Sequence, residues 1–346
     1  MFPTREDAIR QLSEVFEDDA VAVFARLLRP NIGFAPAPSA TRMGATWLGA
    51  TRMGGAPDLP PGIAWPVREV PANLDEIAAL GGSNHGEHIR KHLAQPLPYA
   101  FIAQIDLAEA ARVMPTDNPL PDRGRLLFFC DLPAIPWRDG VESGRVIWDR
   151  APAETLVESR TPSVLLTLAE ESMAELRAAL KAHGLEPDTL SHPYGGAERP
   201  LRLSIAYALP DAGAPEAQDD AAFVALMDDE DTADAYSDFV SEIAHDRAEG
   251  VARHRLLGYP VPEQDDPRYN AVALLDYGRS RAWDWPDRPD MSTIEAQMKT
   301  WHLLLQCDLS DYYQDPLSEG TVYFLIRDDD LRARNFERTV AVYQQT

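Results

Sequence analysis

Two apolar runs of the sequence each contain one amide and one carboxylate side chain, groups that bind ligands or form buried hydrogen bonds. Gln104 and Asp106 lie in the first run, and Gln306 and Asp308 lie in the second. Side chains alternate along a strand, so each pair points to one face if the runs are β-strands. Buried amides and carboxylates need hydrogen-bond partners. The sequence therefore predicts either a polar site or a buried polar network on each strand.

An R-x-x-G-x-P segment, which begins at Arg52 and again at Arg255, precedes each run. Arginine is a strong hydrogen-bond donor to a carboxylate. One interpretation is a set of internal ion pairs, Arg52 with Asp106 and Arg255 with Asp308. The other places both sets around a cleft between the two parts of the chain, where they bind a ligand. The candidate ligand-binding residues are Arg52, Gln104, Asp106, His254, Arg255, Gln306 and Asp308.

Histidines are the other residues that could carry chemistry. His254 directly precedes Arg255, and a histidine near a carboxylate is either a general base or, more often, a hydrogen-bonded structural group. His85, His88 and His92 have the spacing H-x2-H-x3-H, which in a helix gives one face that can bind zinc. The glycines around this segment weaken a helix, and no known metalloenzyme spacing matches. We therefore assign no catalytic residue, no metal and no cofactor.

The two polar runs belong to a longer internal repeat. Pro57 and Gln104 are 47 residues apart, and Pro260 and Gln306 are 46 residues apart. A glycine-led β-type run follows each Q-x-D-L sequence, at residues 124–128 and 320–324. Three matches in the same order, about 203 residues apart, predict an ancient duplication.

The pattern of apolar residues predicts helices over 5–28, 168–183 and 233–248, and another that begins at Ser292. Thr4 and Asp7 resemble a capping box for the first helix. Short β-type runs lie at 100–105, 126–130, 146–148, 201–207, 303–307, 322–326 and 340–343. Helices and strands do not alternate strictly, so we predict an α+β fold. We expect a duplicated, pseudo-two-fold arrangement of mainly antiparallel β-sheets with peripheral helices.

We expect one globular unit made of four segments. These are an N-terminal helix (1–35), a first repeat half (40–150), a helix-containing middle with an acidic connection (151–250), and a second repeat half (251–346). The loop at Trp283 and Trp285 has two aromatic side chains in a polar setting, which is typical of an interface anchor.

Several of these blocks resemble the YwqG-like proteins, a bacterial family of unknown function. The similar blocks are Thr51–Pro60 with Trp65-Pro66, Phe101–Leu107, Gly124–Phe129, His254–Pro260, Leu303–Asp308 and Gly320–Ile326. The resemblance covers roughly residues 45–346. It implies a duplicated α+β fold and a soluble bacterial protein, but no established reaction. Some members are thought to be immunity proteins beside polymorphic toxins. The N-terminal helix and an insertion around residues 75–97 depart from the family.

Composition excludes several classes of function. The chain has 56 acidic and 32 basic residues and a formal net charge of −24, so it repels nucleic-acid phosphates. No apolar run is long enough to span a bilayer, and the N-terminus lacks the pattern of a signal peptide. The only cysteines, Cys130 and Cys307, lie in apolar runs, where we expect small buried side chains. These features predict a cytoplasmic protein without nucleic-acid or membrane partners.

The distribution of charge directs the functional prediction. Twelve acidic residues and no Lys or Arg lie between Leu203 and Asp246, a stretch that we interpret as a solvated, partly mobile connection. Such a surface attracts a basic protein. We therefore predict a non-enzymatic protein-binding module, such as an intracellular immunity or inhibitor protein for a toxin. The alternatives are a small-ligand-binding protein, or a hydrolase with its site in the cleft between the halves.

Overall fold

The fold combines helices around one large antiparallel sheet, as the sequence predicts. The structure is a computed structural model that describes residues 2–37, 48–138, 140–185, 191–245, 252–278, 285–315 and 318–345. It contains 42% helix and 23% strand, which confirms the α+β class. None of the helices in these ranges is long and apolar enough to cross a membrane.

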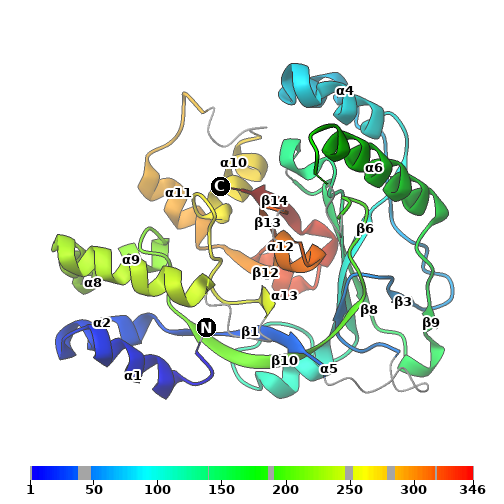
Figure 1. Ribbon diagram of the computed structural model, residues 1–346. Coiled ribbons are helices and arrows are strands. Elements are labelled where there is room, and N and C mark those ends of the chain that lie inside the picture. Colours follow the sequence, from blue (N-terminus) through cyan, green and yellow to red (C-terminus); the bar gives the residue numbers. More distant parts are fainter. Residues whose placement is uncertain are drawn as a thin grey trace.

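The sheet has ten strands in the order β14-β13-β12-β11-β1-β10-β2-β6-β7-β8, and all neighbours are antiparallel (Figure 1). Its two ends approach each other, because Gly140, shortly before β8, forms a bridge to Ala341 of β14. The sheet is therefore nearly closed. The strands are β1 (Arg29–Pro36), β2 (Arg52–Met53), β6 (Ala100–Asp106), β7 (Arg125–Cys130), β8 (Gly144–Asp149), β10 (Arg199–Ala208), β11 (Ala252–Leu256), β12 (Trp301–Asp308), β13 (Thr321–Arg327) and β14 (Val340–Gln344).

An apolar core fills the inside of this sheet. Phe128 of β7 and Phe324 of β13 have ring centroids 5.2 Å apart in an edge-to-face arrangement. Ile32 and Phe34 of the central strand β1 are also fully buried in this core. Cys130 and Cys307 are not joined by a disulfide, and both are fully buried. The prediction that the cysteines are small buried side chains is confirmed.

Four short strands form two small sheets outside the large one. β3 (Asp58–Leu59) pairs with β9 (Val157–Glu158), and β4 (Val67–Arg68) pairs with β5 (Leu97–Pro98). Leu59 and Trp65 pack on Phe101 and Phe129, so this region covers the outer face of β6 and β7. The outer face of β12–β14 is covered instead by α10 (Pro267–Tyr277) and α11 (Met291–Met298).

The expected single helix over residues 5–28 is two helices, α1 (Arg5–Val15) and α2 (Asp18–Leu27). Phe16 between them is extended, and its ring packs edge-to-face on Phe24, 4.9 Å away. This contact folds α2 back onto α1, which a continuous helix does not allow. The N-terminal cap is confirmed, because the Thr4 side chain accepts a hydrogen bond from the backbone N–H of Asp7.

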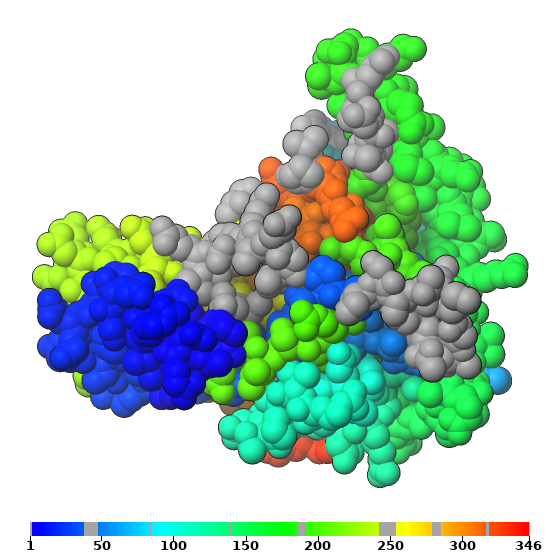
Figure 2. All heavy atoms as spheres, turned by 60° about the horizontal axis from the view of Figure 1, so that its bottom comes forward, coloured from blue at the N-terminus to red at the C-terminus, as the bar shows by residue number. Residues whose placement is uncertain are grey.

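The acidic stretch is not a mobile connection in the described residues. It forms α7 (Pro215–Gln218), α8 (Ala221–Met227) and α9 (Glu230–His245). Phe223 and Tyr236 of these helices pack on Phe24 of α2, with ring centroids 5.9 and 4.7 Å apart. We call α1, α2, α7, α8 and α9 the helical layer. Its longer helices stand together at one side of the molecule (Figures 1 and 2).

Other helices were missed or displaced in the sequence analysis. The insertion around residues 75–97 contains α3 (Leu74–Leu80) and α4 (Gly82–Leu93), and the helix expected at 168–183 is α6 (Ser163–Ala182). The helix expected to begin at Ser292 is α11, whose cap is Asp290. Two short helices directly follow matching strands, α5 (Leu107–Val113) after β6 and α12 (Leu309–Tyr313) after β12. One more, α13 (Asp328–Ala333), follows β13.

Candidate functional site

Arg52 and Gln104 lie side by side on the outer face of the sheet, where they form a closed buried network. Arg52 pairs with Gln104 across β2 and β6, and its guanidinium forms an ion pair with Asp58 at 2.5 Å. The other Asp58 oxygen accepts from the backbone N–H of Gly49 at 2.7 Å and from Nε2 of Gln104 at 3.0 Å. Asp58 is fully buried. Arg52 is therefore neutralised by Asp58, a residue that the sequence analysis did not select, and not by Asp106.

Arg255 and Gln306 are placed in the same way on the other part of the sheet. They pair across β11 and β12, and Oε1 of Gln306 accepts from the backbone N–H of Val261 at 2.9 Å. Oε1 of Gln104 makes the matching bond to the backbone N–H of Asp58, also at 2.9 Å. Burial lowers the pKa of Arg255 to about 10.

Asp106 and Asp308 are helix caps. Asp106 accepts from the backbone N–H of Ala108 at 3.0 Å at the start of α5. Asp308 accepts from the backbone N–H of Asp311 at 2.8 Å and from the Ser310 hydroxyl at 2.7 Å at the start of α12. A carboxylate at this position satisfies N–H groups that have no partner within the helix.

His254 is fully buried on the inner side of the sheet. Its Nε2 lies 3.1 Å from the Arg199 guanidinium and 3.2 Å from a carboxylate oxygen of Asp311. Burial lowers the pKa of His254 to about 4, against the opposing effect of the Asp311 charge. The imidazole is therefore neutral at pH 7. His254 thus lies on the opposite face of β11 from Arg255, its neighbour in the chain, because side chains alternate.

The seven candidate residues are therefore not brought together around one cleft. Arg52 with Gln104 and Arg255 with Gln306 occupy two places on the outer face, and β1 and β10 separate β11 from β2. The space that the sheet encloses between the two parts is occupied by apolar side chains of both.

The three clustered histidines of α4 also separate. The His85 ring stacks on Trp137, with centroids 5.4 Å apart, whereas His88 is exposed. His92 contacts Asp131 through Nε2 at 2.6 Å, and Arg68 binds the other oxygen of this carboxylate at 2.6 Å. In the described part of the chain, no group of three or more His, Cys, Asp or Glu residues could hold a metal ion.

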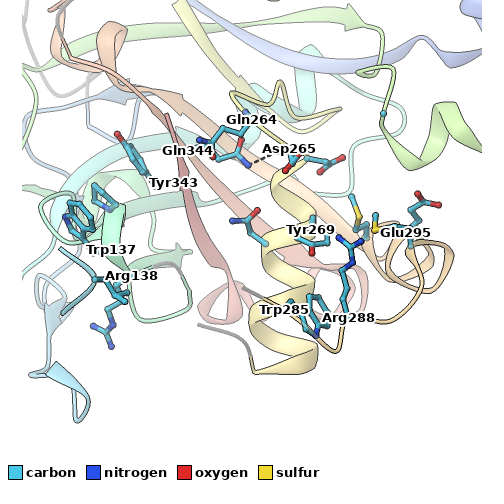
Figure 3. Close-up of a pocket in the computed structure, with 17 residues that line it drawn as sticks. Trp137, Arg138, Gln264, Asp265, Tyr269, Trp285, Arg288, Glu295, Tyr343 and Gln344 are labelled. Carbon is cyan, nitrogen blue, oxygen red and sulfur yellow. Dashed lines mark hydrogen bonds between the residues drawn. The ribbon is translucent and has the colours of Figure 1, made fainter. Parts of the chain in front are cut away.

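A cavity of about 520 Å³ lies between α10, α11, the end of β14 and the short 3-10 helix η1 (Ile135–Trp137). We call it the α10–α11 pocket. Tyr269 and Trp285 line one side and Trp137 and Tyr343 line the other, as Figure 3 shows. Four aromatic side chains from distant parts of the chain therefore surround one space. Trp285, from the aromatic loop noted in the sequence, is buried, whereas Trp283 lies outside the described residues.

Local hydrogen bonds hold the walls of this pocket in place. Asp266 caps α10, and Arg268 binds both Asp266 and Glu216 of α7. Burial opposes the charged form of Glu216, but hydrogen bonds and charge from Arg268 outweigh it, so the pKa of Glu216 is lowered. Gln344 at the end of β14 accepts from the backbone N–H of Glu263 at 3.2 Å and donates to the Asp265 carbonyl at 2.6 Å. The pocket is therefore preformed, as small-molecule sites usually are.

The lining of the pocket combines polar and charged side chains with the aromatic rings. Arg138, Asn270, Arg288 and Glu295 contribute to its lining, and Arg288 is exposed at its edge. This arrangement can orient a ligand by hydrogen bonds and ring contacts.

The protein-family model described as Domain of unknown function (DUF1963) matches residues 51–344, which is most of the chain. The protein belongs to the DUF1963 family. No curated protein matches the sequence.

The DUF1963 match includes the whole α10–α11 pocket but only part of the helical layer. Every lining residue of the α10–α11 pocket, from Leu80 to Gln344, lies inside the matched range. The helices α1 and α2 and the central strand β1 precede it. The pocket is therefore built from the DUF1963 region alone, whereas the helical layer combines this region with the N-terminal segment. The residues of the pocket are scattered along the chain, so no sequence pattern indicates it except the aromatic loop at Trp285.

Proposed function

We propose that this protein binds a small organic ligand in the α10–α11 pocket. The observation that carries the proposal is one preformed cavity of about 520 Å³ with four aromatic side chains and several polar groups around it. Typical ligand sites enclose roughly 300–1,000 Å³ and combine an apolar lining with a few polar groups. The function is one of the alternatives that the sequence left open.

The lining indicates a ligand with a flat or apolar body and a polar edge. Tyr269 and Trp285 are 6.2 Å apart between ring centroids, and they present aromatic surface to the cavity. Arg288 and Glu295 lie at the same side and carry opposite charges (Figure 3). Polar groups of a ligand can therefore bind at this side while its body contacts the rings.

A substitution that fills the pocket tests this proposal. Met291 lines the pocket and its side chain is 39% exposed, so Met291→Trp introduces an indole with little strain on the core. In a thermal-shift screen of a small-molecule library, ligands that stabilise the wild type should lose their effect in this variant. The matched control is Leu275→Trp on α10, which is 37% exposed and does not line the pocket. If ligands stabilise the Met291→Trp variant as strongly as the wild type, the pocket is not their site.

A second candidate function is protein binding, as expected for an immunity or inhibitor protein of a basic toxin. The observation in its favour is the surface of the helical layer, where exposed acidic side chains outnumber exposed basic ones. These acidic residues are Glu6, Glu14, Glu17, Asp18, Asp19, Asp219, Asp228, Asp229, Glu230, Asp231, Asp234 and Asp238, and the basic ones are Arg5, Arg10 and Arg26. Such a surface accelerates association with a cationic protein.

The test of this second function is a pull-down with the protein encoded beside this gene, at low and at high salt. Binding should weaken strongly at high salt and after the four acids from Asp228 to Asp231 are replaced by their amides. Binding that is equal at both salt levels and unchanged in the variant would contradict the electrostatic role.

We also infer that the chain arose by duplication of one unit and is a YwqG-like member of its family. In support, β6 and β12 share a one-residue irregularity, between Phe101 and Ala103 and between Leu303 and Leu305. The strand order on either side of the β1–β10 pair is also equivalent. Replacing Gln104 or Gln306 by Met should lower the urea midpoint in both cases, because each change leaves a backbone N–H without its acceptor. An effect at only one position would argue against equivalent units.

A further inference from the structure

Arg255 is a buried cation without a counter-charge in the described part of the chain. Its side chain is only 3% exposed, and its Nε atom has no hydrogen-bond partner. None of the ion pairs among the described residues includes it, and Tyr323 is the one titratable group whose charge affects it. A buried charge without a partner is strongly unfavourable. The protein therefore carries an unfavourable arrangement at this position.

The surroundings of Arg52 resemble those of Arg255, except that Arg52 has a carboxylate partner and Arg255 has none among the described residues. Asp58 follows Arg52 by six residues and supplies the carboxylate, and Val261 follows Arg255 by six residues. The backbone N–H groups of Asp58 and Val261 make the same 2.9 Å bond to a glutamine side chain. Val261 thus occupies the position of Asp58, but its side chain is apolar and cannot neutralise Arg255.

A second position differs between the two parts of the sheet, and here too an acidic residue in the first part is a neutral residue in the second. A side chain at Gly55, in the turn after Arg52, would meet Cβ of Glu198 at 2.7 Å. A side chain at Gly258, in the turn after Arg255, would meet Cβ of Asn31 at 2.6 Å. Glu198 and Asn31 therefore stand at equivalent places, and the carboxylate of the first is an amide in the second. Asp58 beside Arg52 thus corresponds to Val261 beside Arg255, and Glu198 in β10's approach to β2 corresponds to Asn31 in β1.

The side-chain amides of Asn31 and Gln306, which neighbour Arg255, also have hydrogen-bond donors without a partner among the described residues. Asn31 is fully buried, and neither its Nδ2 nor its Oδ1 has a partner. Gly33 is opposite Arg255 across β1 and β11, and Asn31 is two residues along β1 from Gly33. Asn31 and Arg255 therefore share the outer face as diagonal neighbours. Nε2 of Gln104 bonds Asp58, whereas Nε2 of Gln306 donates to none of the described residues.

The turn after Arg255 also borders a cavity. About 130 Å³ of space, or roughly four water molecules, lies between Val261 and the side chains of Tyr236 and Val240 on α9. Asp211 is the carboxylate in its lining, and it is exposed to solvent, where its charge is screened. Pro260 and Val261 of the turn line this cavity, whereas Arg255, Asn31 and Gln306 are not among its lining residues.

We propose that Arg255 anchors an anion site, in which the carboxylate of a small ligand takes the place that the Asp58 side chain has beside Arg52. The guanidinium supplies the charge, and the amides of Asn31 and Gln306 supply further donors. The ligand carboxylate thereby completes a network that the other part of the sheet closes with its own residue. This site is separate from the α10–α11 pocket, so the proposal does not depend on the function proposed there.

Formate is the probe that tests the site, with the full-length chain at neutral pH. Sodium formate should raise the melting temperature of the wild type saturably, by about 2 °C or more above sodium chloride at equal ionic strength. Val261→Asp supplies an internal carboxylate at the position of Asp58, so the formate effect should vanish in this variant. Arg255→Met should also abolish it. A formate effect that equals that of chloride, or that persists in Arg255→Met, would overturn the proposal.

Unfolding in urea without added carboxylate supplies an independent readout. Arg52→Met leaves Asp58 buried without its partner, so this variant should unfold at a clearly lower urea concentration than the wild type. Arg255→Met removes an unpaired buried charge, so its urea midpoint should equal or exceed that of the wild type. If both variants are destabilised alike, Arg255 has an internal partner and the anion site is excluded.

Discussion

Single residues decide where buried charge is tolerated in this protein. Asp58 receives hydrogen bonds from a backbone N–H and an amide in addition to the Arg52 ion pair. A buried ion pair is tolerated only when its remaining polar atoms are also bonded. The second Asp58 oxygen accepts these two bonds, and Nε of Arg52 donates to the Ala56 carbonyl at 3.1 Å, so the network is structural.

Removing the Asp58 charge should be costly. Asp58→Ala leaves Arg52 buried without an anion, and it removes the acceptor of the Gly49 N–H and of Nε2 of Gln104. We expect a loss of about 3–5 kcal/mol in the free energy of unfolding, measured by urea denaturation. The control Asp234→Ala changes an exposed carboxylate of α9 and should cost less than about 0.5 kcal/mol. Equal effects of the two changes would contradict the structural role of Asp58.

His254 should make stability depend on pH below neutrality. Its pKa in the folded protein is lowered to about 4, mainly by burial, whereas an unfolded histidine titrates near 6.5. Between these values the unfolded chain binds more protons, so stability falls as the pH falls from about 6.5 to 4. The linked loss is on the order of 3 kcal/mol.

The variant His254→Gln isolates this contribution, because glutamine does not titrate and keeps a polar side chain. Urea unfolding at pH 7 and at pH 4.5 should show a smaller drop for the variant than for the wild type. A drop of the same size in both proteins would show that carboxylates, and not His254, cause the acid sensitivity.

At the scale of elements, the helical layer has a core of its own. Phe24 is fully buried among Phe16, Phe223 and Tyr236, with ring contacts to each. These residues belong to a cluster distinct from the one inside the sheet. The layer can therefore lose its packing while the sheet keeps its own core.

The substitution Phe24→Ala tests this independence. It should destabilise the helical layer by about 3–5 kcal/mol through the cavity that it leaves. Hydrogen exchange should then speed up in α1, α2, α8 and α9 and remain slow in β6, β7, β12 and β13. Val15→Ala, at a side chain that is 53% exposed on α1, is the control. Faster exchange throughout the sheet in Phe24→Ala would show that the two cores unfold as one.

At the scale of the whole molecule, the net charge of −24 opposes compaction. Screening weakens repulsion between exposed charges. The melting temperature should therefore rise by a few degrees when sodium chloride is increased from low to about 0.5 M. A variant with amides at Asp228, Asp229, Glu230 and Asp231 should melt higher at low salt and respond less to salt. A melting temperature that falls with salt would indicate that attractive ion pairs dominate.

The sequence by itself determined much of the secondary structure near the site. Short, nearly continuous apolar runs indicated β6, β7, β12, β13 and β14 nearly in full, because these strands are buried on both faces. The R-x-x-G-x-P and Q-x-D runs suggested ion pairs of Arg52 with Asp106 and of Arg255 with Asp308. The structure instead places Arg52 beside Gln104, and Arg255 beside Gln306, across paired strands. Both cysteines were recognised as buried from their apolar surroundings.

Only the tertiary structure decided which groups meet. Asp58 became the partner of Arg52 because a turn brings it beside β2, whereas Asp106 caps α5 at the end of its strand. The sequence predicted a helix over 233–248, which is α9, but not α7 and α8. These two helices form where Phe223 of α8 packs on Phe24, which lies far earlier in the chain. The α10–α11 pocket joins η1, α10, α11 and β14. Such contacts depend on how the whole sheet curls, and no local pattern of residues encodes them.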